Sequence, residues 1–125
     1  MILLDTSAWV EYFKSTEKGT KVKELFYQNM GVYTCPLTLA EISVWCHKNK
    51  ENPEAFIQKI KLLSAMLELT ADILLASGRT YSVEREKNGK IGLIDCIIYN
   101  SARFHGLKLW TKDKDFENLV DVELI

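Results

Sequence analysis

Four acidic side chains each interrupt or end an apolar run of this chain. They are Asp5 after residues 1–4, Glu41 after 37–40, Asp95 within 92–98, and Asp113 after 107–112. A carboxylate is costly to place in an apolar environment unless it is paired or holds a cation. Their repetition along a short chain therefore predicts one site that the fold assembles around a metal ion.

The chemistry of such a cluster limits which ion it would hold. Two carboxylates ~5 Å apart repel by ~3 kcal/mol at an effective dielectric near 20. A cluster of four must therefore keep protons or bind a cation. Oxygen ligands without thiolate or imidazole favour Mg²⁺, with Mn²⁺ as the alternative, over zinc or copper.

Short apolar strands alternate with helical patterns along the chain, which predicts an α/β fold: a three-layer α/β/α sandwich around a mostly parallel sheet. We expect strands at 2–5, 31–35, 67–70, 107–111 and 122–125, and helices at about 6–13, 38–50, 54–67, 71–87 and 93–105. A further amphipathic helix is marked by Val22, Leu25 and Phe26, after a polar stretch at 15–20. Thr6 or Ser7 is the expected N-cap of the first helix. Pro36 should end the second strand, and Gly106 should follow the last helix as its C-terminal glycine.

This arrangement would bring the acids to one edge of the sheet. Asp5 and Asp113 directly follow predicted strands, and parallel strands place their carboxyl ends on the same edge, where ligands bind. Asp95 falls in the first turn, and Glu41 in the first or second turn, of helices that begin at that edge. An alternative for these two is that helix starts favour acids because of the helix dipole. That alternative does not explain Asp5, which is tied to a strand end.

Composition excludes several other classes of protein. The 125 residues predict one domain, 1–125, and 47% hydrophobic with 26% charged residues is typical of a globular protein. A formal net charge of -1 excludes a strongly basic nucleic-acid binder. No run is long enough for a membrane span, and no signal peptide is expected. Three cysteines without a C-x-x-C pair indicate reduced, buried thiols and a cytoplasmic protein.

Four blocks of the sequence resemble the signature blocks of PIN-domain proteins, and most closely the VapC toxins of type II toxin–antitoxin systems. The blocks are Leu4-Asp5-Thr6-Ser7-Ala8-Trp9, Leu39-Ala40-Glu41, Leu93-Ile94-Asp95 with Ala102 downstream, and Leu109-Trp110-Thr111-Lys112-Asp113-Lys114-Asp115-Phe116. The resemblance covers essentially the whole chain, in order.

This resemblance implies a metal-dependent endoribonuclease that cleaves single-stranded RNA, with catalytic and metal-binding positions at Asp5, Glu41, Asp95 and Asp113. Thr6 and Ser7 match the hydroxyl position after the first acid, Asp115 matches a second, less constant acid, and Thr111 supports the same block. It also implies a homodimer and an antitoxin protein that fills a groove beside the acids, presenting an Arg or Lys to them. Trp9, Tyr12, Phe13 and Trp45 are candidates for that groove, although the first three are more typical of a core face.

Other chemistries account for less of the sequence. Cys46 and His47 are adjacent, which is not the spacing of zinc ligands. A Toprim-like site would use Glu41 and the Asp113 region but leave Asp5 and Asp95 unexplained. A receiver-like phosphoacceptor would need a second acid where Thr6 stands. A non-catalytic RNA- or protein-binding module of the same fold stays open as the alternative function.

Asp113 and Asp115 are two residues apart and could exchange roles. We expect Asp113 to be the metal ligand because it is nearer the strand end. Asp115 precedes a short helical stretch and is the expected N-cap of that stretch.

Overall fold

The computed structural model describes residues 1–125 and contains one sheet of five parallel strands. The strands are β1 (Ile2–Leu4), β2 (Val32–Thr34), β3 (Ala65–Met66), β4 (Lys108–Thr111) and β5 (Val122–Leu124). Their order in the sheet is β3-β2-β1-β4-β5. The chain builds outward from β1 on one side and then crosses to form β4 on the other. The strand order therefore reverses between β1 and β4, the position where open parallel sheets bind ligands.

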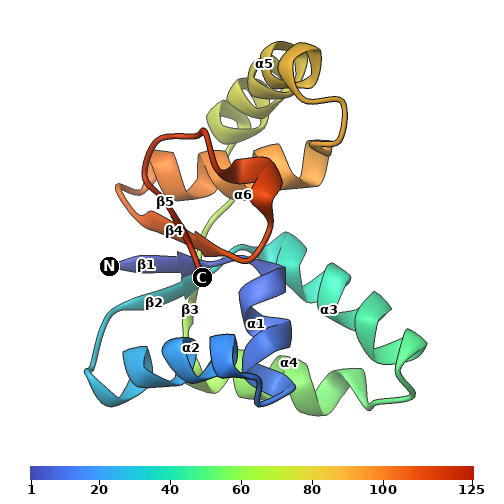
Figure 1. Cartoon of the computed structure of the whole chain (residues 1–125), viewed down its shortest axis with the longest axis vertical. Coiled ribbons are helices and arrows are strands. Elements are labelled where there is room, and N and C mark those ends of the chain that lie inside the picture. Colours follow the sequence, from blue (N-terminus) through green and yellow to red (C-terminus); the bar gives the residue numbers. More distant parts are fainter.

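Helices cover both faces of this sheet, which confirms the predicted α/β/α layers (Figure 1). They are α1 (Thr6–Phe13), α2 (Glu17–Tyr27), α3 (Pro36–Lys48), α4 (Pro53–Leu63), α5 (Ala71–Lys87) and α6 (Leu93–Phe104), with a 3-10 turn η1 (Lys114–Phe116) after β4. In Figure 1, α1 to α4 lie on one side of the sheet and α6 on the other, with α5 packed outside α6.

The central strand β1 shows why the apolar opening of the chain forms a buried strand. Ile2 and Leu4 belong to the core shared with α1, α2, α3 and α4. Leu3 points to the opposite core, with Ile98 of α6 and Leu109 of β4. Because neighbouring side chains of a strand face opposite sides, a strand covered on both faces must be apolar at every position.

The start of α1 differs from the prediction. Asp5, not Thr6 or Ser7, is the N-cap residue, and it makes no side-chain capping bond to the helix. The hydroxyls of Thr6 and Ser7 donate to carboxylates instead. The physical reason is backbone conformation: Asp5 has the extended backbone of an N-cap, whereas Thr6 and Ser7 already lie within the helix, so their hydroxyl groups can donate to carboxylates.

The helix predicted at 54–67 ends four residues early, and the strand predicted at 67–70 is two residues shorter and lies nearer the N-terminus. Helix α4 ends at Leu63, and β3 comprises only Ala65–Met66. Ser64 ends the helix in an extended conformation, and its hydroxyl bonds both Ile60 O at 2.8 Å and Thr34 Oγ1 at 2.7 Å. The bond from Ser64 to Thr34 of β2 brings the chain into the sheet at residue 65, before residue 67, where the apolar pattern predicted the strand to begin.

Proline and glycine mark element ends as predicted. Pro36 follows β2, as predicted, but it is also the first residue of α3, two residues before the predicted start of that helix; Pro53 begins α4. Gly106 follows α6 with φ +65°, a left-handed conformation that glycine adopts without strain.

All three cysteines are free and buried, which confirms the prediction made for them. No helix has both the length and the apolar character needed to cross a membrane.

Candidate functional site

The fold places two of the four acids on adjacent strands. Asp5 follows β1 and Asp113 follows β4, and β1 pairs with β4 in a register that sets Leu4 beside Trp110. The main-chain N–H of Asp5 donates to Trp110 O at 2.9 Å. Both acids therefore lie at the carboxyl edge of the sheet, where the strand order reverses.

The other two acids approach this edge from helices. Glu41 lies in the second turn of α3, and Asp95 lies in the first turn of α6. The charges of Asp5, Asp113 and Glu41 all raise the pKa of Asp95, after the larger effect of burial. The charge of Asp113 similarly raises the pKa of Asp5, and that of Asp5 raises the pKa of Glu41. The structure thus brings all four predicted acids close enough to repel one another.

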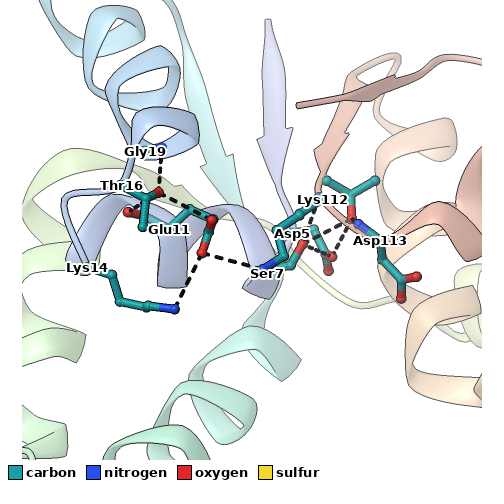
Figure 2. Close-up of polar contacts among 9 residues, drawn as sticks. Asp5, Ser7, Glu11, Lys14, Thr16, Gly19, Lys112 and Asp113 are labelled. Atoms are coloured by element: carbon teal, nitrogen blue, oxygen red, sulfur yellow. Dashed lines mark hydrogen bonds and ion pairs between the residues drawn. The ribbon is translucent and has the colours of Figure 1, made fainter.

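Asp5 is the most deeply buried of the four, with 4% of its surface exposed. Its Oδ2 accepts from Thr111 Oγ1 at 2.7 Å and from Ser7 Oγ at 2.9 Å (Figure 2). Burial raises the pKa of Asp5, and these two hydroxyl bonds oppose the rise because they favour the charged form. Ser7 and Thr111, both predicted as supporting residues, therefore orient one carboxylate.

The contacts of Ser7 and Thr111 determine which acceptor each hydroxyl proton takes. Their two oxygens lie 3.1 Å apart, so each is within bonding distance of the other. Each hydroxyl has a single proton, and an anionic acceptor is preferred over a neutral one. Both protons therefore go to Asp5, and each oxygen is left to accept a main-chain N–H: Lys112 N donates to Ser7 Oγ and Asp113 N donates to Thr111 Oγ1, each at 3.0 Å.

Glu41 is oriented by hydroxyl groups in a similar way. Thr6 Oγ1 donates to Glu41 Oε1 at 2.5 Å and also lies 3.1 Å from the buried Thr38 Oγ1. Burial raises the pKa of Glu41, while the bond from Thr6 opposes that rise. Thr6, predicted as a supporting residue, therefore orients Glu41, and Thr38 is a further contributor.

Asp95 accepts a main-chain hydrogen bond from Gly92 N at 3.0 Å through Oδ2. Burial, followed by the three neighbouring carboxylates, raises the pKa of Asp95 from 3.8 to about 6. The bond from Gly92 lowers it but does not compensate. Perturbed acids in a cluster are typical of functional sites, because stability alone would not select for the repulsion.

The roles assigned to Asp113 and Asp115 need correction. Asp113, not Asp115, is the N-cap of η1: its Oδ1 accepts from Asp115 N at 2.9 Å. The extended backbone at Asp113 lets its short side chain fold back to the next turn, as in an Asx-turn. Asp115 instead accepts from Asn88 Nδ2 at 3.2 Å, which ties it to the loop after α5. Asp113 therefore has a structural task as well as its place beside Asp5.

These residues fit a hydrated ion better than a closed coordination shell. As the side chains lie, no three His, Cys, Asp or Glu residues are grouped so that all could hold one ion directly. Mg²⁺ commonly uses one or two carboxylates and keeps several waters, so direct ligation by all four acids is not required. The donor set is entirely oxygen, and its mutual repulsion favours a cation. The fit is to Mg²⁺ or Mn²⁺ and not to zinc.

Of the predicted groove residues, Trp45 is placed beside the acids and Trp9 is not. Trp9 is fully buried in the core and stacks on Phe13 at a centroid distance of 5.8 Å, so its assignment to a surface groove was wrong and its core assignment is confirmed. Trp45 lines a cleft of about 410 Å³ that also includes Glu41 and Ile94.

One buried acid near the site was missed by the sequence reasoning. Glu11 of α1 is 5% exposed and forms an ion pair with Lys112, the residue before Asp113. The available signal was helical spacing: Glu11 lies four residues after Ser7 and therefore on the same face of α1. An acid on the face that carries a site hydroxyl could have been singled out.

The match to a family model settles the class of protein. The model of the PIN domain matches residues 2–122, and the chain belongs to the PIN-domain family. The predicted resemblance is thereby confirmed.

Among individual relatives, the chain is 28% identical over 122 residues to the VapC ribonuclease Mb1587 of Mycobacterium bovis and to ribonuclease VapC11 of Mycobacterium tuberculosis, covering 94% of this chain and 90% of each relative. Among solved structures, it is similar to a toxin–antitoxin complex from Klebsiella pneumoniae, with a TM-score of 0.79, 22% identity and coverage of 98% of this chain and 96% of the other. It is also similar to VapC20 of Mycobacterium tuberculosis, with a TM-score of 0.78, 19% identity and coverage of 99% and 98%. These structural similarities establish a shared fold.

Proposed function

We propose that this protein is a VapC-type toxin, a metal-dependent endoribonuclease that cleaves single-stranded RNA. The observation that supports this most directly is the cluster of four mutually repelling carboxylates at the point where the strand order reverses. The names of the relatives agree with it, since those at 28% identity are called VapC ribonucleases.

Each acid has a defined task in this proposal. Asp5, Asp95 and Asp113 would hold the hydrated ion, one or two of them directly and the rest through its waters, and Glu41 would complete the cluster directly or through water. The chemistry that Mg²⁺ or Mn²⁺ supplies is activation of a water for in-line attack at phosphorus and neutralisation of charge on the phosphate. Ser7 and Thr111 keep Asp5 oriented with their hydroxyl protons, and Thr6 does the same for Glu41.

Binding of the metal ion should release a proton from Asp95. A raised pKa means that Asp95 is partly protonated near pH 6 in the metal-free protein. Cation binding would release that proton, because ligands must be deprotonated to bind. Metal affinity should therefore rise with pH across this range.

RNA must approach an acidic centre, so cations at its margin are required. Lys112 and Lys114 flank Asp113, and the side chains of both lysines are exposed. Once the metal ion neutralises the carboxylates, the site would attract the phosphates of RNA and no longer repel them.

The test is cleavage of a fluorescently labelled single-stranded RNA by purified protein. We expect cleavage with Mg²⁺ or Mn²⁺ and none with EDTA, and loss of cleavage in Asp95→Asn. Asp72→Asn is the matched control: Asp72 is an exposed acid in the first turn of α5, so it changes the same charge at the same kind of position. Chelator-resistant cleavage, or equal activity in Asp95→Asn, would contradict the proposal. Metal binding without cleavage would favour the alternative, a non-catalytic RNA- or protein-binding module.

A partner protein is also part of the proposal. Several solved structures of similar fold are VapBC complexes, including VapBC-1 of nontypeable Haemophilus influenzae, with 25% identity, a TM-score of 0.73 and coverage of 100% of this chain and 97% of the other. By analogy we propose a homodimer held inactive by an antitoxin in the cytoplasm.

The cleft beside Glu41 is the candidate antitoxin groove. It is lined by Trp45, Val44, Val10 and Ile94, so an apolar segment would fit there, with an Arg or Lys reaching the carboxylates. Pull-down from the native host should recover a small partner protein, and Trp45→Ala should weaken its retention. A strictly monomeric protein with no partner would contradict this part.

A further inference from the structure

Glu11 is a buried carboxylate that lies outside the four-acid cluster. Its side chain is only 7% exposed, and its Oε2 has no hydrogen-bond donor. Two ammonium groups approach that same oxygen, Lys112 Nζ at 3.6 Å and Lys14 Nζ at 3.9 Å. A buried carboxylate is tolerated only when its charge is compensated, so these lysines are needed where they lie.

The junction of α1 and α2 fixes Glu11 in place. Thr16 Oγ1 donates to Glu11 Oε1 at 3.2 Å, and Thr16 N donates to the main-chain oxygen of Glu11 at 3.3 Å. A Cβ on Gly19 would lie 2.1 Å from that main-chain oxygen, so α2 can pack this closely only because position 19 is glycine. Glu11 is therefore a stationary anion and not a mobile surface acid.

Lys112 connects this anion to the metal-site loop. It lies between Thr111, whose hydroxyl donates to Asp5, and Asp113. Lys112 contacts α1 twice: its main-chain N–H donates to Ser7 Oγ at 3.0 Å, and its Nζ lies 3.6 Å from Glu11. Figure 2 shows Glu11 on one side and Asp5 with Asp113 on the other, with Lys112 between them.

We propose that Glu11 is a positioning residue for the metal site: through Lys112 it holds the loop that bears Asp113 against α1, and so fixes Asp113 relative to Asp5. The main-chain bond from Lys112 to Ser7 alone would leave the loop at Asp113 free to shift. The ion pair of the Lys112 side chain with the fixed Glu11 carboxylate restrains it further. The inference rests on the proposed function only in assigning a metal to the four acids. The attachment of the loop is a property of the fold.

The sign of one effect separates positioning from simple electrostatics. Lys112→Met removes a cation near the acids, which by itself would tighten cation binding. Loss of positioning would weaken it. Lys14→Met is the matched control, because Lys14 approaches the same oxygen of Glu11 from within α1 and has no bond to the loop.

The experiment measures Mn²⁺ affinity without RNA, by titration, and the hydrogen exchange of the Lys112 and Asp113 amides by NMR. We expect Lys112→Met and Glu11→Gln each to weaken Mn²⁺ binding roughly threefold to tenfold and to speed exchange of both amides. The double variant should be no worse than the poorer single variant, because both act through one contact. Lys14→Met should leave affinity and exchange within about twofold of wild type.

Two results would overturn the inference. One is tighter or unchanged Mn²⁺ binding in Lys112→Met. The other is a Glu11→Gln variant that melts at a lower temperature but keeps wild-type exchange at Lys112 and Asp113, since Glu11 would then serve only the α1–α2 junction. If wild type binds no Mn²⁺, the proposed function fails, and the exchange data still decide whether Glu11 restrains the loop.

Discussion

Replacement of Asp95 by Asn should stabilise the metal-free protein at neutral pH. The pKa of Asp95 rises from 3.8 to about 6 in the folded protein, first through burial and then through Asp5, Asp113 and Glu41. Its charged form is therefore less favourable in the folded protein than in the unfolded chain. Asn removes the charge and keeps an oxygen that can accept the bond from Gly92 N.

The pKa rise sets the size and the sign of this effect. Each whole pKa unit corresponds to about 1.4 kcal/mol, so the rise gives a ceiling of about 3 kcal/mol. Asp95 is only partly buried, and solvent screening reduces the expected gain at pH 7.5 to about 1 kcal/mol. Because the folded pKa lies above the unfolded one, the folded protein binds the extra proton between about pH 4 and pH 6. Wild-type stability from this group is thus present at low pH and is lost as pH rises through about 6.

Urea denaturation in EDTA at pH 4.5 and pH 7.5 measures this difference. Asp95→Asn should be more stable than wild type at pH 7.5, and the advantage should shrink at pH 4.5. Asp72→Asn, in the exposed first turn of α5, should show no such gain. Addition of Mn²⁺ should reverse the order at pH 7.5 by stabilising wild type more than Asp95→Asn. If Asp95→Asn is no more stable than wild type at pH 7.5 without metal, the four acids do not repel one another as described.

Three further predictions concern the other acids. Millimolar Mg²⁺ or Mn²⁺ should raise the melting temperature of wild type, with about 2.7 kcal/mol of stabilisation near 100 times Kd, whereas Asp5→Asn should melt higher without metal and gain less from it; a melting temperature that ignores metal would contradict the site. Asp113→Asn should abolish cleavage with little loss of stability, because Asn also caps η1, while Asp113→Ala should lose about 1 kcal/mol in denaturation as well as activity. Asp115→Asn should keep measurable cleavage, since the side chain of Asp115 bonds Asn88 and only its main-chain N–H reaches Asp113; an inactive Asp115→Asn with an active Asp113→Asn would reverse the assignment.

The sequence by itself determined the fold class and the edge of the sheet to which the acids belong. Apolar runs broken by Asp5, Asp95 and Asp113 were enough to predict strands, helices and one acidic edge. This succeeded because burial of a strand on both faces requires an uninterrupted apolar run, and because parallel strands place their ends together. Proline and glycine signals predicted the end of β2, the start of α4 and the end of α6 for equally local reasons, but not the start of α3, which begins at Pro36 and not at the predicted 38.

Only the tertiary structure decided which partner each polar group takes. Thr111 reaches Asp5, and Lys112 reaches Glu11, because β4 pairs beside β1 although the residues are about a hundred positions apart in the chain. The structure likewise shows that Asp113, and not Asp115 as predicted, is the N-cap of η1. Local propensity specifies which donors and acceptors exist, but their pairing depends on distances that the packed sheet alone sets.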